Sequence, residues 1–367
     1  MGKLNILFVI DHLGGGGAEL QLVEIMNNLN RRDFQISLFL TEGGGVRQNK
    51  LKEDIAIFGV HGERKRKPLR TILNLRKLVK KISPDLIVSW LEYSTFITVL
   101  AISCLKLRHY AGVWGNLEYI YTKEVKLGLI KKFLLRLAYQ RVDKIIFNSY
   151  NVAEKNDWIK NKNKVVIYNV FDVEKIRRMQ GKVELRRILN LKNDYFYIVF
   201  VGSLVSRKGV NLLIESFIKV ANPKLKLLIV GTGPLEENLK KISANDERIE
   251  FLGYRENAIE YIKASDLLIL PSFSEGIPNV IIEALACETP VIATDVDGIP
   301  EIIKHKKSGL LIKPCSVEEI KKSIEYAVIN YQEMISFAQE GRKIVEKFKR
   351  ETIIFQFEEL FRNSQQK

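Results

Sequence analysis

Two glutamates eight positions apart stand where they could bind the hydroxyl groups of a phosphorylated sugar. Glu275 follows an apolar strand pattern, and Glu283 lies within the helical pattern that comes next. Pro278 suits a first helical turn, so we expect the helix to begin there. Gly276 and the free N–H groups of that turn would form an anion site. Carboxylates accept hydrogen bonds only, so two of them beside a phosphate site would suit a nucleotide-sugar.

The same two glutamates have simpler interpretations. The chain has 43 acidic residues, so the spacing alone can arise by chance. Glycoside hydrolysis would need two carboxyl groups roughly 5–9 Å apart across one bond. Glu283 would lie more than one turn into its helix, about 8 Å past the start by helical rise. The pattern therefore favours binding over hydrolysis.

A second candidate loop carries adjacent cations. Gly202 and Gly209 bound the loop, which contains Arg207 and Lys208 and lies between a strand pattern and a helix pattern. Two cations on such a loop suit a pyrophosphate. The loop lacks the G-x-x-x-x-G-K-[ST] spacing of a Walker A motif. The alternative is that both cations are ordinary surface charges.

A third candidate is the run of four glycines from Gly14 to Gly17, directly after the first strand pattern. Glycine allows close backbone approach to a ligand, and the following helix (Ala18–Leu29) offers its N-terminus to an anion. A dinucleotide fingerprint also needs an acidic residue after the next strand, and Glu42 is only a weak match. A plain tight turn is the other alternative.

These loops need strands and helices to position them. Apolar strand patterns alternate with helical patterns, which predicts right-handed βαβ units and parallel sheets. There are too many strands for one sheet, so we predict two Rossmann-like doubly wound domains facing a central cleft. The expected strands are 4–10, 34–40, 85–89, 109–113, 144–148 and 165–168 in the first half, and 197–202, 226–230, 249–252, 267–270, 291–294 and 309–312 in the second.

The predicted domain boundary lies between Asn169 and Gln180, where a strand pattern leads into a charged stretch. We therefore divide the chain into an N-terminal domain of residues 1–170 and a C-terminal domain of residues 171–349. The helical pattern Arg350–Arg362, within residues 350–367, is expected to pack back toward the N-terminal domain.

Composition excludes several classes of protein. The chain has 367 residues, of which 46% are hydrophobic and 28% charged, as in ordinary globular proteins. No apolar run approaches the ~18 residues of a membrane span, and the N-terminus has the pattern of a strand and not of a signal peptide. The three cysteines (Cys104, Cys287 and Cys315) lack metal-ligand spacing, which favours a reducing cytoplasm and no zinc site.

The net charge of +15 is unevenly distributed. Residues 1–170 contain 28 Lys and Arg against 15 Asp and Glu, whereas residues 171–367 contain 30 against 28. Basic stretches occur at 64–70, 76–81 and 123–141. The last has Leu127, Ile130, Leu134 and Leu137 at helical spacing among lysines and arginines. It is either a membrane-surface helix or a helix packed on its own domain with a solvated basic face.

Taken together, these motifs resemble the retaining glycosyltransferases of family 4, also called group 1, which have the two-domain GT-B fold. The resemblance covers nearly the whole chain and is densest from Val201 to Pro314. It is carried by the Glu-x7-Glu motif, by the segments 202–209, 231–234, 290–294, 298–303 and 309–311, and by the N-terminal run Gly16-Gly17-Ala18-Glu19.

The resemblance implies a role for each matching residue. Glu275 would contact the donor sugar, Glu283 the ribose, and Lys208, helped by Arg207, the donor diphosphate. The remaining donor-binding residues implied are Gly15, Gly16, Gly17, Ser203, Gly233, Tyr254, Arg255, Gly276, Ile277, Pro278 and Asn279. The family is generally metal-independent, so no metal or other cofactor is expected. Asp295-Val296-Asp297 has the form of a metal motif but falls where the family holds no metal.

The chain also departs from the family pattern. Ser203 stands where the family usually has Arg, and Trp114 stands where many members have a His near the donor sugar. His12, Trp114 and Asn116 are therefore our acceptor-side candidates, whereas His109 is expected to be structural.

The expected activity is transfer of a sugar, with retention of configuration, from a nucleoside diphosphate-sugar to an acceptor. UDP-hexose or UDP-N-acetylhexosamine is the expected donor. The acceptor would be a lipid-linked or polysaccharide glycan, as in lipopolysaccharide or capsule assembly. The basic N-terminal half predicts a cytoplasmic enzyme attached peripherally to the anionic inner face of the cell membrane. The alternatives are a nucleotide-sugar epimerase of GT-B-like fold and a basic nucleic-acid-binding protein, although the sequence lacks the interleaved aromatics of the latter.

Overall fold

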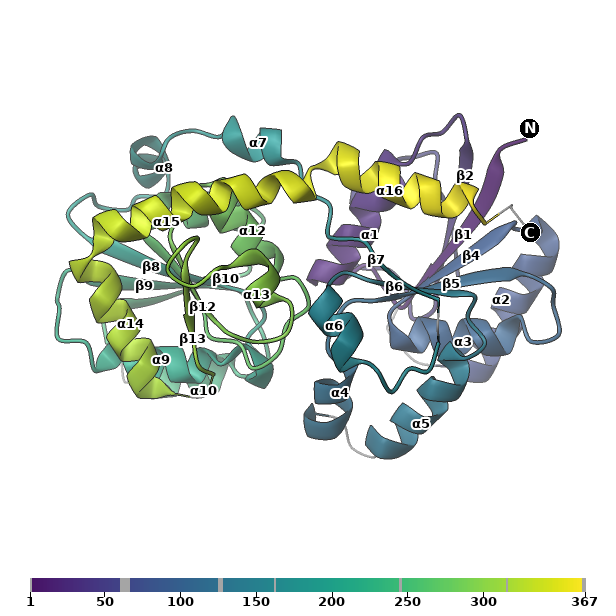
Figure 1. The fold of residues 1–367 in the computed structure, drawn as a ribbon, viewed down its shortest axis with the longest axis horizontal. Helices are drawn as coiled ribbons and strands as arrows, with labels where there is room; N and C mark the ends of the chain where they lie inside the picture. Colours follow the sequence, from purple (N-terminus) through teal and green to yellow (C-terminus); the bar gives the residue numbers. More distant parts are fainter. Residues whose placement is uncertain are drawn as a thin grey trace. The chain divides into compact units, whose positions relative to one another are not determined.

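The computed structural model describes residues 2–59, 67–124, 128–161, 163–243, 246–314 and 316–364. The chain forms two units, one of residues 1–170 with 350–367 and the other of residues 171–349 (Figure 1). Parts of two predicted basic stretches, 64–66 and 125–127 with Leu127, lie outside the described residues, as does Cys315.

Unit 1 is built on a seven-stranded parallel sheet of order β3-β2-β1-β4-β5-β6-β7. Its strands are β1 (Leu4–Ile10), β2 (Phe34–Leu40), β3 (Ala56–Gly59), β4 (Leu86–Trp90), β5 (Arg108–Val113), β6 (Lys144–Phe147) and β7 (Lys164–Val166). The central strand β1, with the sequence LNILFVI, is buried along almost its whole length. Continuous apolar strands of this kind are typical of parallel sheets covered on both faces.

The helices of unit 1 fill crossovers between its strands, except the last one, which returns from the end of the chain. They are α1 (Gly17–Asn28), α2 (Pro68–Ile82), α3 (Glu92–Ala101), α4 (Leu117–Tyr119), α5 (Gly128–Tyr139), α6 (Tyr150–Lys155) and α16 (Arg350–Arg362), with the short turns η1 (Gln48–Lys50) and η2 (Ile120–Glu124).

Unit 2 contains a six-stranded parallel sheet of order β10-β9-β8-β11-β12-β13. Its strands are β8 (Phe196–Val201), β9 (Leu225–Val230), β10 (Ile249–Gly253), β11 (Leu267–Leu270), β12 (Val291–Thr294) and β13 (Leu310–Ile312). Its helices are α7 (Val173–Arg177), α8 (Lys182–Ile188), α9 (Val210–Ile218), α10 (Glu236–Ile242), α11 (Ala258–Ala264), α12 (Asn279–Ala286), α13 (Ile299–Ile302), α14 (Val317–Ile329) and α15 (Tyr331–Ile344), with η3 (Ser206–Lys208) and η4 (Val345–Phe348).

Two doubly wound parallel sheets confirm the predicted fold class, and the expected strands agree with the observed ones to within a few residues. The sequence prediction missed β3, a four-residue strand on the sheet edge that is only partly buried. Helix α12 begins at Asn279, one residue later than predicted, because Pro278 has an extended backbone (φ −74°, ψ 117°) and acts as the N-cap.

The C-terminal helix α16 packs on unit 1, as expected. Phe361 is fully buried and makes edge-to-face contacts with Phe8 on β1 and Phe34 on β2, with ring centroids 6.0 and 6.4 Å apart. Glu358 accepts a hydrogen bond of 2.8 Å from the backbone N–H of Asn30. The last helix of the chain therefore completes the core of its first domain (Figure 1).

Helix α5 turns its apolar stripe outward. Leu135, Ala138 and Tyr139 face the core of unit 1. A second apolar group on the same helix is exposed, with 74% exposure for Leu129 and 59% for Phe133; its members are Leu129, Ile130, Phe133, Leu134 and Leu137. The stripe predicted from Ile130, Leu134 and Leu137 is therefore not the surface that holds α5 on its own domain.

Candidate active site

The loops that carry Lys208 and Glu275 meet at the point of unit 2 where the strand order reverses. Strands β8 and β11 are adjacent and parallel although β9 and β10 lie between them in sequence. Lys208 follows β8, and Glu275 follows β11, so both loops leave the carboxyl edge of the sheet at this point. In doubly wound sheets this topological switch point is where ligands bind.

Glu275 is the centre of a buried charge cluster. The Glu275 carboxylate accepts hydrogen bonds of 2.5 Å from Lys208 Nζ and 2.7 Å from Ser272 Oγ, both on Oε1. Arg207 Nη1 lies 3.6 Å from Oε2. The Glu275 side chain is only 6% exposed and that of Lys208 only 12%, so Lys208 is not an ordinary surface cation.

The protonation of the cluster follows from its surroundings. Burial raises the pKa of the Glu275 carboxyl, but the charges of Lys208 and Arg207 and the hydrogen bonds from Lys208 and Ser272 outweigh it and leave this pKa below its ordinary value. Burial lowers the pKa of Lys208, and the Glu275 carboxylate opposes that shift. The site thus holds an ion pair whose cation could be shared with an incoming anion.

Asp297 orients the Glu275 loop, a role that sequence reasoning did not find. Its Oδ2 accepts hydrogen bonds from Ser274 Oγ (2.6 Å) and from the backbone N–H of Glu275 (2.9 Å). Asp297 is buried and has a left-handed backbone with φ 46°. The only sequence signal was the Asp295-Val296-Asp297 motif. Its second aspartate, Asp297, accepts the hydrogen bonds that fix the Glu275 loop.

Gly209 lets the two loops approach each other. It has φ +64°, and a Cβ at this position would lie 2.2 Å from the carbonyl oxygen of Pro271 at the end of β11. The N–H of Phe273 also donates a 2.7 Å hydrogen bond to the carbonyl of Arg207. Glycine at 209 is therefore required for the Lys208 loop to lie against the Glu275 loop.

The other residues predicted to bind the donor occupy loops and helix starts of unit 2. Glu283 is partly exposed within α12, whose first residue is Asn279, while Gly276, Ile277 and Pro278 are buried before it. Tyr254 and Arg255 are exposed after β10, and Ser203 is exposed after β8. Gly233 passes close to the backbone of Leu204, since a Cβ there would lie 2.5 Å from the Leu204 carbonyl oxygen.

In unit 1 the glycine-rich loop interacts with the chain's own side chains. Arg47 donates hydrogen bonds to the carbonyls of Gly14 (3.1 Å) and Gly15 (3.0 Å). The Glu19 carboxylate lies against Gly16, where a Cβ would meet Glu19 Oε2 at 2.3 Å. Since Glu19 is in the first turn of α1, a phosphate at this helix N-terminus would meet its negative charge. The anion role predicted for Gly15, Gly16 and Gly17 therefore has weaker support than that of the Lys208 loop.

The acceptor-side candidates have well-defined partners at the carboxyl edge of the unit 1 sheet. His12 Nδ1 accepts a 3.0 Å hydrogen bond from the Gly14 N–H and lies 3.8 Å from Glu19 Oε1. Trp114 stacks on Trp90 with 3.8 Å between ring centroids. Asn116 is the N-cap of α4, where its Oδ1 accepts a 3.1 Å hydrogen bond from the Tyr119 N–H.

Two further titratable groups of unit 1 are perturbed by burial. His109 Nε2 hydrogen-bonds Ser89 Oγ at 2.8 Å, and burial lowers the pKa of His109 to about 3, which fits a neutral structural residue. Burial, together with the nearby Asp11, raises the pKa of Glu92 to about 7. Glu92 opens α3 directly after the end of β4, and the sequence offered no signal for it.

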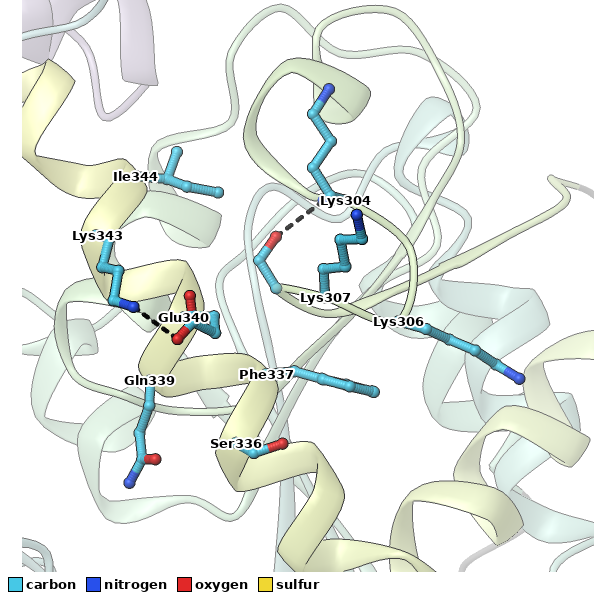
Figure 2. Close-up of a pocket in the computed structure, with 10 residues that line it drawn as sticks. Lys304, Lys306, Lys307, Ser336, Phe337, Gln339, Glu340, Lys343 and Ile344 are labelled. Atoms are coloured by element: carbon cyan, nitrogen blue, oxygen red, sulfur yellow. Dashed lines mark hydrogen bonds and ion pairs between the residues drawn. The ribbon is translucent and has the colours of Figure 1, made fainter.

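One pocket of unit 2 contains none of the predicted site residues. It lies between α15 and the loop that follows α13, and is lined by Lys304, Lys306, Lys307 and Lys343 among others (Figure 2). Figure 2 shows these lysines pointing in different directions, and Lys343 is paired with Glu340 at 2.7 Å. Because the ammonium groups do not converge, the pocket does not form a defined anion site.

The described part of the chain contains neither a metal-binding cluster nor a membrane-spanning helix. Among its residues no group of three His, Cys, Asp or Glu side chains is placed to hold a metal ion. None of its helices is both long and apolar enough to cross a membrane.

Comparison with known proteins agrees with the architecture of two doubly wound parallel sheets. The structure is similar to that of HepE from Anabaena, solved in complex with UDP-glucose, with a TM-score of 0.85, 22% identity, and coverage of 98% of this chain and 100% of HepE. The two doubly wound sheets and this likeness define the fold as GT-B.

The sequence then identifies the family. Residues 182–344 match glycosyl transferases group 1, and residues 15–175 match glycosyltransferase family 4. The chain belongs to this family of glycosyltransferases, which confirms the resemblance and sets aside the epimerase and nucleic-acid-binding alternatives.

Two curated relatives indicate the range of the family. One is N-acetylgalactosamine-N,N'-diacetylbacillosaminyl-diphospho-undecaprenol 4-alpha-N-acetylgalactosaminyltransferase of Campylobacter jejuni, which is 28% identical over 85% of this chain and 86% of its own length. The other is the lipopolysaccharide core biosynthesis glycosyltransferase LpsE of Rhizobium meliloti, 24% identical over 93% of this chain and 95% of its own length.

Proposed function

We propose that this glycosyltransferase moves a sugar from a UDP-sugar to a lipid-linked or polysaccharide acceptor in the synthesis of a cell-surface glycan. The observation that carries the proposal is the ion pair of the nearly buried Lys208 and Glu275, with the partly exposed Arg207 beside it, at the β8–β11 switch point. UDP is proposed because HepE, which shares the fold, was solved with UDP-glucose. The acceptor class is proposed from the names of the Campylobacter and Rhizobium relatives.

In the proposed mechanism the developing charge is on the leaving diphosphate. Lys208 and Arg207 would bind its oxygens, and the N-terminus of α12 would add its positive dipole. Glu275 would exchange part of its ion pair for hydrogen bonds from sugar hydroxyls, and Glu283 would hold the ribose diol. Because these cations supply the positive charge, we propose that no metal ion is needed and that chelators leave turnover unchanged.

Calorimetry with UDP tests the donor site. We expect Lys208→Ala to weaken UDP binding by at least tenfold, because a charge-assisted contact to the diphosphate is lost. Lys307→Ala, which removes an exposed lysine of the same unit, is the matched control and should bind UDP normally. Equal UDP affinity in both variants and the wild-type protein would refute the assignment.

Product analysis tests the reaction class and its stereochemistry. UDP release from a UDP-sugar should rise on addition of a lipid-linked acceptor, as transfer requires. The anomeric proton of the product, observed by NMR, should show the same configuration as the donor. Inversion at this carbon would contradict the proposed retaining mechanism while leaving the transferase activity intact.

We also propose that α5 docks on an anionic membrane. Its exposed apolar stripe, defined above, is accompanied by the exposed cations Lys123, Lys131 and Arg136. Helix α2 packs on α3, as α5 does, and exposes Leu69 and Leu73 beside Arg70. An exposed apolar stripe flanked by cations is typical of helices that lie in the interface of an anionic bilayer.

Flotation with vesicles tests this docking. The protein should bind vesicles containing phosphatidylglycerol and bind phosphatidylcholine vesicles much less. Phe133→Ser should weaken the binding roughly tenfold through lost apolar burial. Phe355→Ser on α16 is a matched control, because Phe355 is 57% exposed and Phe133 59%. Equal binding of both variants, or no preference for the anionic vesicles, would contradict the proposal.

A further inference from the structure

The carboxyl ends of three neighbouring strands of unit 1 carry aromatic side chains and no charges. Trp114 follows β5, Tyr150 follows β6 and Tyr168 follows β7, and these strands are consecutive in the sheet. We call these three side chains the aromatic edge. The segments 109–117, 145–153 and 165–171, which contain them, have no Lys, Arg, Asp or Glu. This neutrality is unusual in a half of the chain that holds 28 basic and 15 acidic residues.

Trp114 is held rigidly. One face of its indole stacks on the fully buried Trp90, and its Nε1 donates a 3.2 Å hydrogen bond to Asn169 Oδ1. Gly112 makes this arrangement possible, because a Cβ at this position would lie 2.6 Å from the Trp114 ring. The indole nevertheless stays partly exposed. Trp114 packs against the core of unit 1 and keeps part of a fixed ring exposed.

The second part of the edge is a pair of tyrosines. Tyr150 is 59% exposed at the start of α6, and its ring lies edge-to-face against that of Tyr168, with centroids 6.1 Å apart. Tyr168 directly precedes Asn169, whose side chain accepts the hydrogen bond from Trp114. The tyrosine pair and the tryptophan pair are therefore linked through two consecutive residues. The same three segments also carry four amide side chains: Asn116, Asn148, Asn151 and Asn169.

We propose that the aromatic edge is the subsite for a neutral pyranose ring of the acceptor glycan. An aromatic face packs against the C–H face of a sugar ring, and the neighbouring polar groups fix its orientation by hydrogen bonds. A phosphate or a carboxylate would find no cation on these segments. This inference rests on the proposed function and adds that the acceptor is recognised through an uncharged sugar unit.

A glycan array tests the inference with the full-length protein. The array would display bacterial surface glycans that carry neutral hexose and N-acetylhexosamine units, together with charged glycans. We expect the wild-type protein to bind neutral glycans, and Tyr150→Ala and Trp114→Ala each to lose about tenfold in affinity. Trp114→Phe, which keeps an aromatic ring, should retain most of the binding. Phe355→Ala removes an exposed ring of α16 and should change nothing.

Two further measurements separate the possible outcomes. Binding to neutral glycans should persist when salt is raised from low to high concentration, whereas contacts between charges would weaken. Calorimetry with UDP should give the wild-type affinity for all four variants. If UDP binding is normal but the array shows no glycan binding, or binding that survives both alanine variants, the aromatic edge is not the subsite. If the wild-type protein fails to bind UDP, the proposed function itself is wrong.

Discussion

The Glu275 carboxylate has two roles at once, because it neutralises a buried lysine and is proposed to bind the donor sugar. A buried ion pair contributes little net stability while it is intact, but removal of one partner leaves an uncompensated charge. Lys208 and Glu275 are both nearly buried and 2.5 Å apart, so their effects on stability and on activity are coupled.

Glu275→Ala is therefore expected to cost roughly 3–5 kcal/mol of unfolding free energy at pH 7, since it strands the Lys208 ammonium. Glu275→Gln should lose less stability but still lose transfer, because an amide cannot replace both oxygen acceptors. Denaturant unfolding and UDP release measured on the same samples distinguish the two effects. Near-normal turnover in the glutamine variant would exclude a role for Glu275 in the reaction.

Glu92 predicts a pH effect on stability. Its folded pKa of about 7 lies above the ordinary value of 4.5, so the folded protein retains a proton that the unfolded chain releases. The stability that Glu92 contributes is complete below pH 4.5 and is lost as the pH rises through 7. The unfolding free energy of Glu92→Gln should therefore rise relative to that of the wild-type protein by roughly 1–3 kcal/mol as the pH increases from 4.5 to 8.

Unfolding free energies of both proteins across this pH range check the effect of Glu92. Because His109 also changes protonation on unfolding, the difference between the two proteins is the relevant quantity. Glu53→Gln, at an exposed site, serves as the control. If the difference in unfolding free energy between the wild-type protein and Glu92→Gln is constant with pH, the pKa of Glu92 is not perturbed.

At the scale of elements, the site depends on loops that approach each other closely at strand ends. Helix α9 follows β8, and helix α12 follows β11. The loop between each strand and its helix carries the residues of the charge cluster. Gly209 is the position where this approach is tightest. Backbone geometry, and not only side-chain chemistry, therefore controls how Lys208 meets Glu275.

Gly209→Ala tests this dependence. The added Cβ would clash with the Pro271 carbonyl, and the left-handed backbone would add strain of about 1–2 kcal/mol. We expect lower stability and weaker UDP binding together. Gly181→Ala is the control, because a Cβ on Gly181 would have nothing within 4 Å and the residue lies at φ −68°. Unchanged UDP affinity in Gly209→Ala would show that the loop can move without affecting the site.

At the scale of the whole molecule, the chain returns to its first unit after building the second. Phe357 and Phe361 of α16 are fully buried against strands that lie more than three hundred residues earlier in the sequence. The stability of unit 1 thus depends on the end of the chain, whereas the charge cluster of unit 2 contains no residue of α16.

Phe361→Ala should destabilise unit 1 by roughly 3–5 kcal/mol, as expected for loss of a buried aromatic ring. UDP binding, proposed for unit 2, should survive at temperatures below the altered transition. Thermal unfolding with and without UDP would show a lowered transition that the nucleotide does not restore. Phe355→Ala on the exposed side of α16 is the control, and an equal melting temperature in both variants would contradict the dependence.

The sequence determined the fold class because periodicity and strand–loop–helix order are local properties. The run LNILFVI predicts a buried strand wherever it is placed, and the loop patterns around Lys208 and Glu275 identify the carboxyl ends of their strands. The family resemblance then identified the candidate donor-binding residues. The short edge strand β3 was missed because four partly buried residues carry too little of a pattern.

Tertiary structure alone decided which of these residues share one environment. Strand order brings Lys208 within 2.5 Å of Glu275 and places Asp297 where it accepts a hydrogen bond from the Glu275 loop. The apolar stripe of α5 is exposed because the opposite face of the helix packs on the core. The Gly-rich loop shows the same limit, since its predicted anion site lies beside Glu19. Local sequence specifies how a segment folds, but burial and electrostatics arise from contacts between distant segments, so only the folded chain decides them.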